Sequence, residues 1–265
     1  MTTAPTPPTP QPPAVYPDLA GKVAVVTGGS RGIGAETGRA LAAQGVAVCL
    51  VGRDRAALFS VAESIGKAGG RATGAVADVT DARALERLAE RVARELGPVD
   101  IVAAFAGGQG APVPALELGE DRWRQVLDSE LTSAFLTLRT FLPGMVEQGR
   151  GSCLTMSSSA GRRPSGANLA YGVANAGLTM LTSQLATEVG PHGVRVNCLA
   201  PSSVRTERVA RQMPPEIQRQ VAAQHPLGRL GEPADVASAA LFLASDAASW
   251  LTGLTIDVAG GRVTS

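Results

Sequence analysis

Residues 23–34 read VAVVTGGSRGIG, and this stretch decides the fold that the sequence predicts. Its first five residues form an apolar run typical of a buried parallel strand, and the glycines after it open a helical pattern. Glycine lets the chain turn sharply and come close to a pyrophosphate, whose oxygens the exposed N–H groups at a helix start can bind. The stretch therefore predicts a strand, a tight turn and a helix arranged to hold a dinucleotide.

Strand-like apolar runs alternate with helical patterns along the rest of the chain. This rhythm is typical of repeated strand–helix–strand units, whose right-handed crossovers build a parallel sheet covered by helices. We expect an α/β fold with one doubly wound, Rossmann-type parallel sheet of about seven strands and helices on both faces. The predicted strands are 23–27, 47–51, 72–77, 101–105, 152–156, 194–199 and 254–258, and the predicted helices are 34–44, 55–68, 81–96, 122–147 and 170–189.

The chain has 265 residues, which is enough for one substantial core and requires no second domain. Residues 1–18 are rich in Thr and Pro and lack the basic start and apolar stretch of a signal peptide. We expect them to form a disordered tail ahead of a single Rossmann-type domain over 19–265. Prolines interrupt residues 202–229 just beyond a predicted strand, so this stretch is either a substrate lid or an ordinary surface connection.

Composition and charge exclude several classes of partner. The formal net charge is +1 with Lys and Arg scattered along the chain, so neither nucleic acid nor an acidic membrane is expected to bind. No run approaches the roughly 20 apolar residues needed to span a bilayer, and we expect a soluble, cytoplasmic protein. Cys49, Cys153 and Cys198 lie in apolar runs without CxxC spacing or a cluster of His, which predicts reduced core residues and no metal site.

The glycine spacing at 27–34 is TGxxxGxG rather than GxGxxG, and here the sequence resembles the short-chain dehydrogenase/reductase family. The resemblance covers nearly the whole chain after the tail. It implies an oxidoreductase with a nicotinamide cofactor and a small-molecule substrate, assembled as a homodimer or homotetramer. The predicted cofactor-binding positions, most of them carried over from matching motifs, are Gly28, Ser30, Arg31, Gly32, Ile33, Gly34, Arg53, Asp78, Val79, Ala106, Gly107, Tyr171, Asn175, Pro201 and Thr206.

The end of the second predicted strand bears on the choice of cofactor. An NAD site usually places an acid there, where it accepts hydrogen bonds from the ribose hydroxyls. This chain has Gly52 followed by Arg53. Arg53, together with Arg31 in the glycine turn, can form charge-assisted bonds to a 2′-phosphate. The sequence therefore favours NADP(H), while the neighbouring Asp54 leaves NAD open.

Four positions carry the chemistry that the family resemblance implies, and two of them are changed. The family uses Asn, Ser, Tyr and Lys, the last two spaced as YxxxK. Tyr171 is present, and Ser158 lies thirteen residues before it, as in the family. Asn175 replaces the lysine, and Glu130 stands where the family has its asparagine. Ser202 also replaces the glycine that normally follows the proline at Pro201.

These changes have chemical consequences. In the family, Tyr donates the proton when a carbonyl is reduced and Ser hydrogen-bonds the carbonyl oxygen. Lys binds the nicotinamide ribose and lowers the tyrosine pKa, whereas Asn175 can hydrogen-bond a ribose hydroxyl but supplies no charge. A tyrosine with an ordinary pKa of about 10 is ionised only about one part in a thousand at pH 7. Since alcohol oxidation needs a base, we expect a carbonyl reductase rather than an alcohol oxidase.

Several alternatives stay open on the residues alone. Glu130 either takes part in proton transfer as a buried carboxyl of raised pKa, or merely hydrogen-bonds Asn175 and fills space. At the level of function, one alternative is a catalytically impaired relative that binds a cofactor or ligand. Another is an enzyme of the same scaffold whose reaction is not a redox reaction. Substrate identity is not readable from the sequence.

Overall fold

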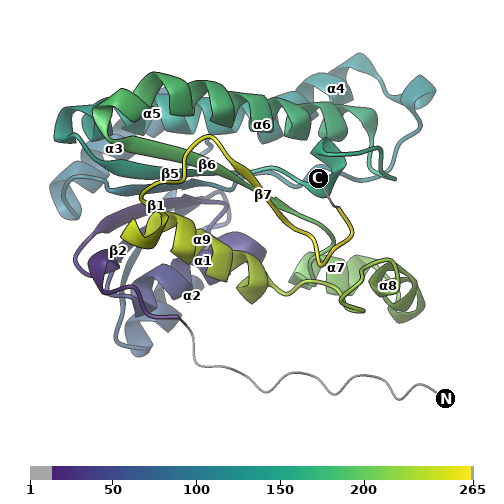
Figure 1. Cartoon of the computed structure of the whole chain (residues 1–265), viewed down its shortest axis with the longest axis horizontal. Coiled ribbons are helices and arrows are strands. Elements are labelled where there is room, and N and C mark those ends of the chain that lie inside the picture. Colours follow the sequence, from purple (N-terminus) through teal and green to yellow (C-terminus); the bar gives the residue numbers. More distant parts are fainter. Residues whose placement is uncertain (1–13, 264–265) are drawn as a thin grey trace.

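Seven parallel strands form one sheet in the computed structural model, which describes residues 14–263. Their order is β3-β2-β1-β4-β5-β6-β7, so the direction of winding reverses between β1 and β4 (Figure 1). The predicted α/β fold is confirmed. The strands are β1 Val23–Thr27, β2 Ala47–Gly52, β3 Arg71–Val76, β4 Ile101–Ala104, β5 Gly151–Met156, β6 Val194–Pro201 and β7 Thr255–Val258.

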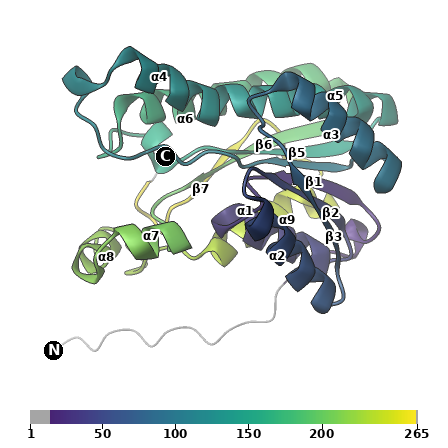
Figure 2. The ribbon, with the colours of Figure 1, turned by 180° about the vertical axis from the view of Figure 1, so that it is seen from behind.

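Helices cover both faces of this sheet. Figures 1 and 2 show α3, α4, α5 and α6 over one face and α1, α2 and α9 over the other. Each face has its own cluster of buried apolar side chains, which explains why the central strands are apolar throughout. The helices are α1 Gly32–Ala43, α2 Arg55–Lys67, α3 Ala82–Glu95, α4 Glu120–Leu127, α5 Ser133–Gln148, α6 Leu169–Val189, α7 Glu207–Gln212, α8 Pro215–Ala222 and α9 Pro233–Ala244.

The helix predicted over 122–147 contains a local widening. Between α4 and α5 the chain forms a π-helical turn, η3, over Asp128–Thr132. A π-turn inserts extra backbone into a helix and commonly marks a functional site. Glu130 lies within this turn and is buried, with 4% of its surface exposed.

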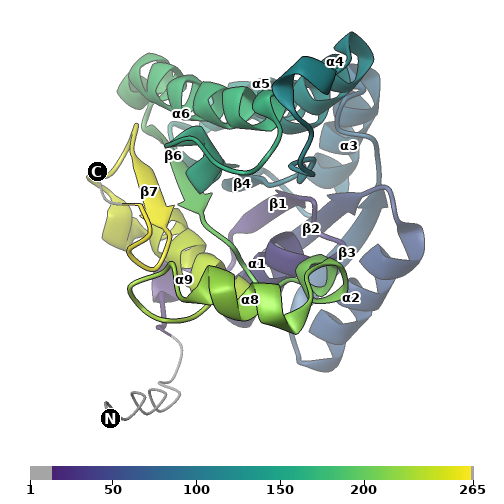
Figure 3. The ribbon, with the colours of Figure 1, turned by 90° about the vertical axis from the view of Figure 1, so that its right-hand side faces the viewer.

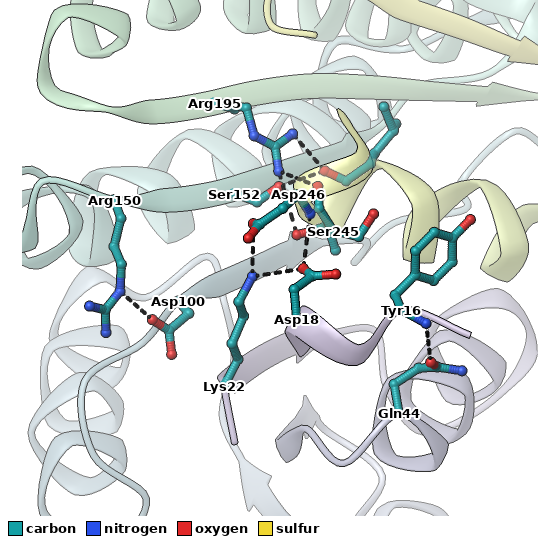
Figure 4. A network of polar contacts seen from close by, with 12 residues as sticks. Tyr16, Asp18, Lys22, Gln44, Asp100, Arg150, Ser152, Arg195, Ser245 and Asp246 are labelled. Carbon is teal, nitrogen blue, oxygen red and sulfur yellow. Dashed lines mark hydrogen bonds and ion pairs between the residues drawn. The ribbon is translucent and has the colours of Figure 1, made fainter. Parts of the chain in front are cut away.

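The amino-terminal segment is only partly described. Residues 1–13 of the predicted tail lie outside the described residues. The last residues assigned to that tail are instead bonded to the domain. The Tyr16 N–H donates to Gln44 Oε1 at 2.8 Å, and Pro17–Leu19 forms a short 3₁₀ helix. Asp18 accepts hydrogen bonds from Lys22 Nζ and the Asp246 N–H (Figure 4).

Charged side chains at the amino ends of the strands are paired with one another. Asp100 accepts from Arg150 Nε and from the Val23 N–H, both at 3.0 Å. Arg195 donates to backbone carbonyls at the end of α9, including Leu243 O at 2.7 Å (Figure 4). A cavity of about 570 Å³ lies among these groups. Because its charges already have partners, we assign this edge to the stability of the fold.

The described residues carry no sign of a metal centre. Within 14–263, no group of three or more His, Cys, Asp or Glu side chains gathers closely enough to hold an ion. Cys49, Cys153 and Cys198 are buried and free, and burial raises the pKa of the Cys49 and Cys153 thiols to about 12. Among the helices of the same residues, none has the length and apolar character required to cross a bilayer.

Candidate active site

The glycine turn has the geometry that a close-approaching phosphate needs. Gly28 and Gly32 have φ values of +67° and +54°, in the left-handed region that favours glycine. A Cβ on Gly28 would lie 2.7 Å from Phe105 O, and one on Gly34 would overlap Gly28 O. Strand β1, the turn and α1 can therefore pack this closely only with glycine at these positions.

Thr27 joins the two strands at which the winding reverses. Its Oγ1 accepts hydrogen bonds from the Phe105 N–H at 2.9 Å and the Ala106 N–H at 3.1 Å. These bonds bring the predicted pair Ala106 and Gly107 beside the glycine turn. Ligands of open α/β sheets bind at such a reversal, beyond the carboxyl ends of the strands. We did not predict a role for Thr27, although it begins the TGxxxGxG motif.

The first turn of α1 already holds a carboxylate. Arg31, the N-cap residue, makes no side-chain capping bond, and the Gly32 N–H donates to Glu207 Oε2 at 3.1 Å. A Cβ on Gly32 would lie 3.1 Å from Thr206 Cγ2, so the predicted residue Thr206 reaches the glycine turn as well. A helix N-terminus binds anions, and the Glu207 carboxylate shows that this one accepts a negatively charged oxygen. The turn therefore fits a dinucleotide.

The carboxyl ends of β2 and β3 lie next to this turn. A Cβ on Gly52 would be 3.7 Å from Ser30 Oγ. Arg31 forms an ion pair with Asp54, whose other oxygen caps α2 through the Ala57 N–H. Asp78 accepts two hydrogen bonds from Thr80, and these bonds lower the pKa of the Asp78 carboxyl, as does the charge of Arg53. The groups predicted to bind the adenosine end of the cofactor are thus close together.

Ser158, Tyr171 and Asn175 meet beyond the carboxyl ends of β5 and β6. Tyr171 lies in the first turn of α6, where Asn168 caps the helix by accepting from the Tyr171 N–H at 2.9 Å. Burial raises the pKa of the Tyr171 phenol and the charge of Glu130 raises it further, while hydrogen bonding with Ser158 and Asn175 lowers it. The net shift is upward, so the phenol is protonated at neutral pH.

Asn175 is turned toward its own helix. The residue is 1% exposed, and its Nδ2 donates to Tyr171 O at 2.8 Å. Ser157 Oγ donates to the Asn175 backbone carbonyl at 2.8 Å and ties this part of α6 to the end of β5. The position of the family's lysine therefore holds a neutral amide, which makes its hydrogen bond to the backbone of α6 itself.

Glu130 binds the loop after β4 rather than Asn175. Its Oε1 accepts hydrogen bonds from the Gly108 and Gln109 N–H groups, both at 2.6 Å. The alternative in which Glu130 pairs with Asn175 is therefore wrong. Burial raises the pKa of the Glu130 carboxyl, and the two N–H donors and the charge of Arg208 oppose that rise. Gly107 is required here, since a Cβ on it would lie 2.5 Å from Glu130 Oε2.

The predicted lid crosses the carboxyl edge of the sheet opposite α4 (Figure 3). It contains α7 and α8 and begins after Pro201, the last residue of β6. Ser202 Oγ lies 3.0 Å from Nε2 of the buried His225, whose Nδ1 bonds Val221 O at 2.8 Å, so α8 is fastened to the end of β6. From α7, the Arg208 guanidinium donates to Gly108 O. Residues 202–229 thus touch both the glycine turn and the loop after β4, the contacts that a lid would make.

Besides Thr27, three contributors to this site were missed in the sequence. Asn168 Nδ2 donates to Gln109 O at 2.8 Å and Ala111 O at 2.9 Å, which holds the loop after β4 against α6. An Asn three residues before Tyr171 is a helix-capping signal that could have been noticed. Glu207 and Arg208 gave no comparable signal, because their partners are backbone groups distant in sequence.

Comparisons with known proteins agree with this geometry. A family model described as enoyl-(acyl carrier protein) reductase matches residues 28–262. The chain is 38% identical over 243 residues to the cis-4-hydroxycyclohexanecarboxylate dehydrogenase of Sinomonas cyclohexanicum, covering 92% of this chain and 97% of the relative.

Solved structures are similar over almost the same length. A protein from Beutenbergia cavernae assigned as an NAD(P)-dependent gluconate 5-dehydrogenase, with NADP bound, has a TM-score of 0.87 and 35% identity over 94% of this chain and 100% of its own. A 3-oxoacyl-[acyl-carrier protein] reductase from Brucella melitensis with bound NAD has a TM-score of 0.89 and 32% identity over 98% and 99%. The chain belongs to the short-chain dehydrogenase/reductase family of oxidoreductases, and its relatives bind nicotinamide cofactors.

Proposed function

We propose that this protein is an NADP(H)-dependent reductase that converts a carbonyl group of a small molecule to a hydroxyl group. One observation carries the proposal. A tyrosine of raised pKa, Tyr171, lies with Ser158 and against Gly110 in the loop after β4, and the start of that loop is hydrogen-bonded to Thr27 at the glycine turn. The relatives support the reaction class, since a dehydrogenase named for a hydroxy compound and a 3-oxoacyl reductase catalyse opposite directions of the same chemistry.

Each side chain has a defined part in this reaction. A nicotinamide cofactor held at the glycine turn would supply the hydride that the carbonyl carbon receives, and the chain's own side chains would handle the oxygen and its proton. Ser158 Oγ hydrogen-bonds the carbonyl oxygen, on which negative charge develops as the bond order falls. Tyr171 donates its proton to that oxygen. Asn175 has one amide hydrogen that Tyr171 O does not use, which it would offer to a ribose hydroxyl of the cofactor, and Glu130 holds the loop after β4 in shape through two N–H bonds.

The arrangement around β2 supports NADP(H) over NAD(H). Asp54, the acid nearest the position where an NAD site needs one, is already engaged by Arg31 and by the start of α2. Arg53 forms no ion pair within residues 14–263 and is exposed next to Asp78. A guanidinium in this place is suited to a 2′-phosphate. The NADP and NAD complexes among the relatives show that the family accommodates either cofactor.

The proposal also includes a cytoplasmic location and a homodimeric or homotetrameric assembly. Exposed apolar side chains support self-association: Leu169, Val173 and Met180 are spaced along one face of α6, and Phe135 is exposed on the neighbouring α5. Light scattering at micromolar concentration would measure the assembly directly.

Titration of the purified full chain with NADPH and NADH, followed by nucleotide fluorescence, tests the cofactor assignment. Turnover of bound NADPH against a panel of ketones, including a cyclohexanone carboxylate and a keto-gluconate, tests the reaction. We expect saturable NADPH binding at lower concentration than NADH, and NADPH consumption with at least one ketone. Binding without consumption would instead support the impaired, ligand-binding alternative, and substrate turnover without NADPH consumption would support a reaction that is not a redox reaction.

A further inference from the structure

The Tyr171 site presents a charge problem. The position from which the family's lysine acts holds the neutral Asn175, and Glu130 adds negative charge nearby. An anionic neighbour makes tyrosinate harder to form, so both the proton transfer from Tyr171 and its reverse lack the usual electrostatic support. A cation elsewhere in the site would offset this effect.

The loop after β4, residues 107–111, gathers the groups that face Tyr171. Gly108 uses both of its peptide groups: its N–H donates to Glu130 Oε1 and its carbonyl accepts from Arg208 Nη1. Two residues further, a Cβ on Gly110 would lie 3.2 Å from Tyr171 Cδ1. Glu130 from η3, Arg208 from α7 and Tyr171 from α6 therefore all contact one short loop.

Glycine at position 108 allows the guanidinium of Arg208 to lie directly on this loop. Gly108 has a φ of +103°, and a Cβ there would be 2.9 Å from both Nη1 and Nη2 of Arg208. Arg122, on α4, is a second cation at the loop, but it donates to Gln109 O and to Gln125. The charges that act on the Tyr171 phenol are those of Glu130 and Arg208, and its other polar neighbours, Ser158 and Asn175, are neutral.

We propose that Arg208 is a positioning residue that supplies, from the lid, the positive charge that the family's lysine supplies from α6. Its guanidinium is held at the loop after β4 and stabilises negative charge on the Tyr171 oxygen as the proton leaves. The site has this positive charge only while α7 holds Arg208 on that loop. This role rests on the proposed reductase function, but its physical basis, the field at Tyr171, can be measured without turnover.

The chain contains only two tyrosines, Tyr16 and Tyr171, so a Tyr16→Phe background makes ultraviolet titration of tyrosinate specific for Tyr171. Adding Asn175→Lys in this background should lower the Tyr171 pKa, so that tyrosinate forms at a lower pH than in the parent. Arg208→Gln is then introduced and compared with Arg211→Gln, which removes an exposed arginine from the last turn of the same helix. Arg208→Lys tests whether charge alone suffices.

We expect Arg208→Gln to lower the tyrosinate fraction at a fixed pH by about threefold to tenfold, with Arg208→Lys near the parent and Arg211→Gln equal to it. In a chain with the natural Asn175, Arg208→Gln should lower kcat for alcohol oxidation and shift its pH profile upward, while NADPH affinity stays unchanged.

An unshifted Tyr171 titration in correctly folded Arg208→Gln would overturn the proposal, as would equal effects of Arg208→Gln and Arg211→Gln. If no substrate is turned over by the unaltered protein, the reductase assignment fails, yet the titration still decides whether Arg208 acts on Tyr171. The two failures are therefore distinguishable.

Discussion

The two edges of the sheet use charge in opposite ways. At the amino edge, Asp18, Asp100 and Asp246 have basic side chains or backbone N–H groups as partners, and Arg195 is saturated by backbone carbonyls. At the carboxyl edge Arg31 pairs with Asp54, but within residues 14–263 the buried Glu130 beside Tyr171 forms no ion pair and is bound by backbone N–H groups, and Asn175 replaces a cation. A buried charge without a paired counterion is the kind of group that shifts pKa values at functional sites.

The size of a cavity is therefore a poor guide to function in this molecule. The cavity of about 570 Å³ lies at the amino edge, among charged groups that have partners within the fold. At the carboxyl edge, the glycine turn is partly covered by Glu207, and its anion-binding capacity shows in a hydrogen bond rather than in an open volume. The following substitutions test whether the two edges differ in this way.

The largest expected effect is the loss of the proton donor. Tyr171→Phe keeps the ring and removes the phenolic proton, so kcat/KM for ketone reduction should fall by about 10²- to 10⁴-fold. The matched control is Tyr16→Phe, near the amino edge, which should leave kcat/KM unchanged. Steady-state kinetics with one ketone, together with thermal melting to confirm folding, provide the measurement. Full activity in Tyr171→Phe would mean that another group donates the proton.

The next largest effect concerns the missing cation. Asn175→Lys should raise reductase activity, and should raise alcohol oxidation at pH 7 more, by about tenfold or above, because a lysine charge lowers the pKa of Tyr171. Initial rates in both directions on one ketone–alcohol pair measure this. The control is Asn175→Met, because methionine is similar to lysine in bulk but carries no charge. No gain in either direction would indicate a proton route that does not depend on the tyrosine pKa.

The fold was readable from the sequence because its signals are local. Residues 23–27 and 101–104 are buried on both faces, so their strands appear as unbroken apolar runs, and Gly28 and Gly34 are required by contacts within or beside the same strand–turn–helix unit. Ser158 and Tyr171 were identified through the family resemblance, which their spacing of thirteen residues supports. Helix starts were also close to their predicted places, since Asp81 caps α3 where the pattern predicted a helix.

The rest of the site depends on partners that no side-chain pattern reveals. Glu130 binds N–H groups 21 and 22 residues away, and Arg208 binds a carbonyl 100 residues away. Every residue offers such backbone groups, so the sequence cannot indicate which of them will be used. The π-turn that contains Glu130 is a small departure from a regular helix. It changes the apolar periodicity of the sequence too little to be recognised.

A moderate effect is expected from the carboxylate that occupies the glycine turn. A cofactor pyrophosphate must displace Glu207 from the Gly32 N–H and would meet its negative charge. Glu207→Gln should therefore tighten NADPH binding by about threefold to tenfold, and added salt should shrink the difference. Glu216→Gln, on α8 and paired with Arg219, is the control that should leave the Kd unchanged. Weaker NADPH binding in Glu207→Gln would show that the carboxylate assists the cofactor rather than competing with it.

The smallest effect, on stability, bears most directly on the contrast between the two edges. Because burial raises the folded-state pKa of Glu130, its contribution to stability is fully present below the unfolded pKa near 4.5 and is lost as the pH rises through the folded pKa. Glu130→Gln keeps an oxygen that can accept from the Gly108 and Gln109 N–H groups. Because the amide does not ionise, the variant should not lose stability as the pH rises. Urea unfolding should therefore show a stabilisation that grows from acid to neutral pH. Asp100→Asn, at the amino edge, should instead cost about 1 kcal/mol at pH 7, because it weakens the bonds to Arg150 and Val23. Equal destabilisation by the two substitutions at pH 7 would mean that the Glu130 charge stabilises the fold as much as the Asp100 charge does. The proposed difference between the two edges would then be wrong.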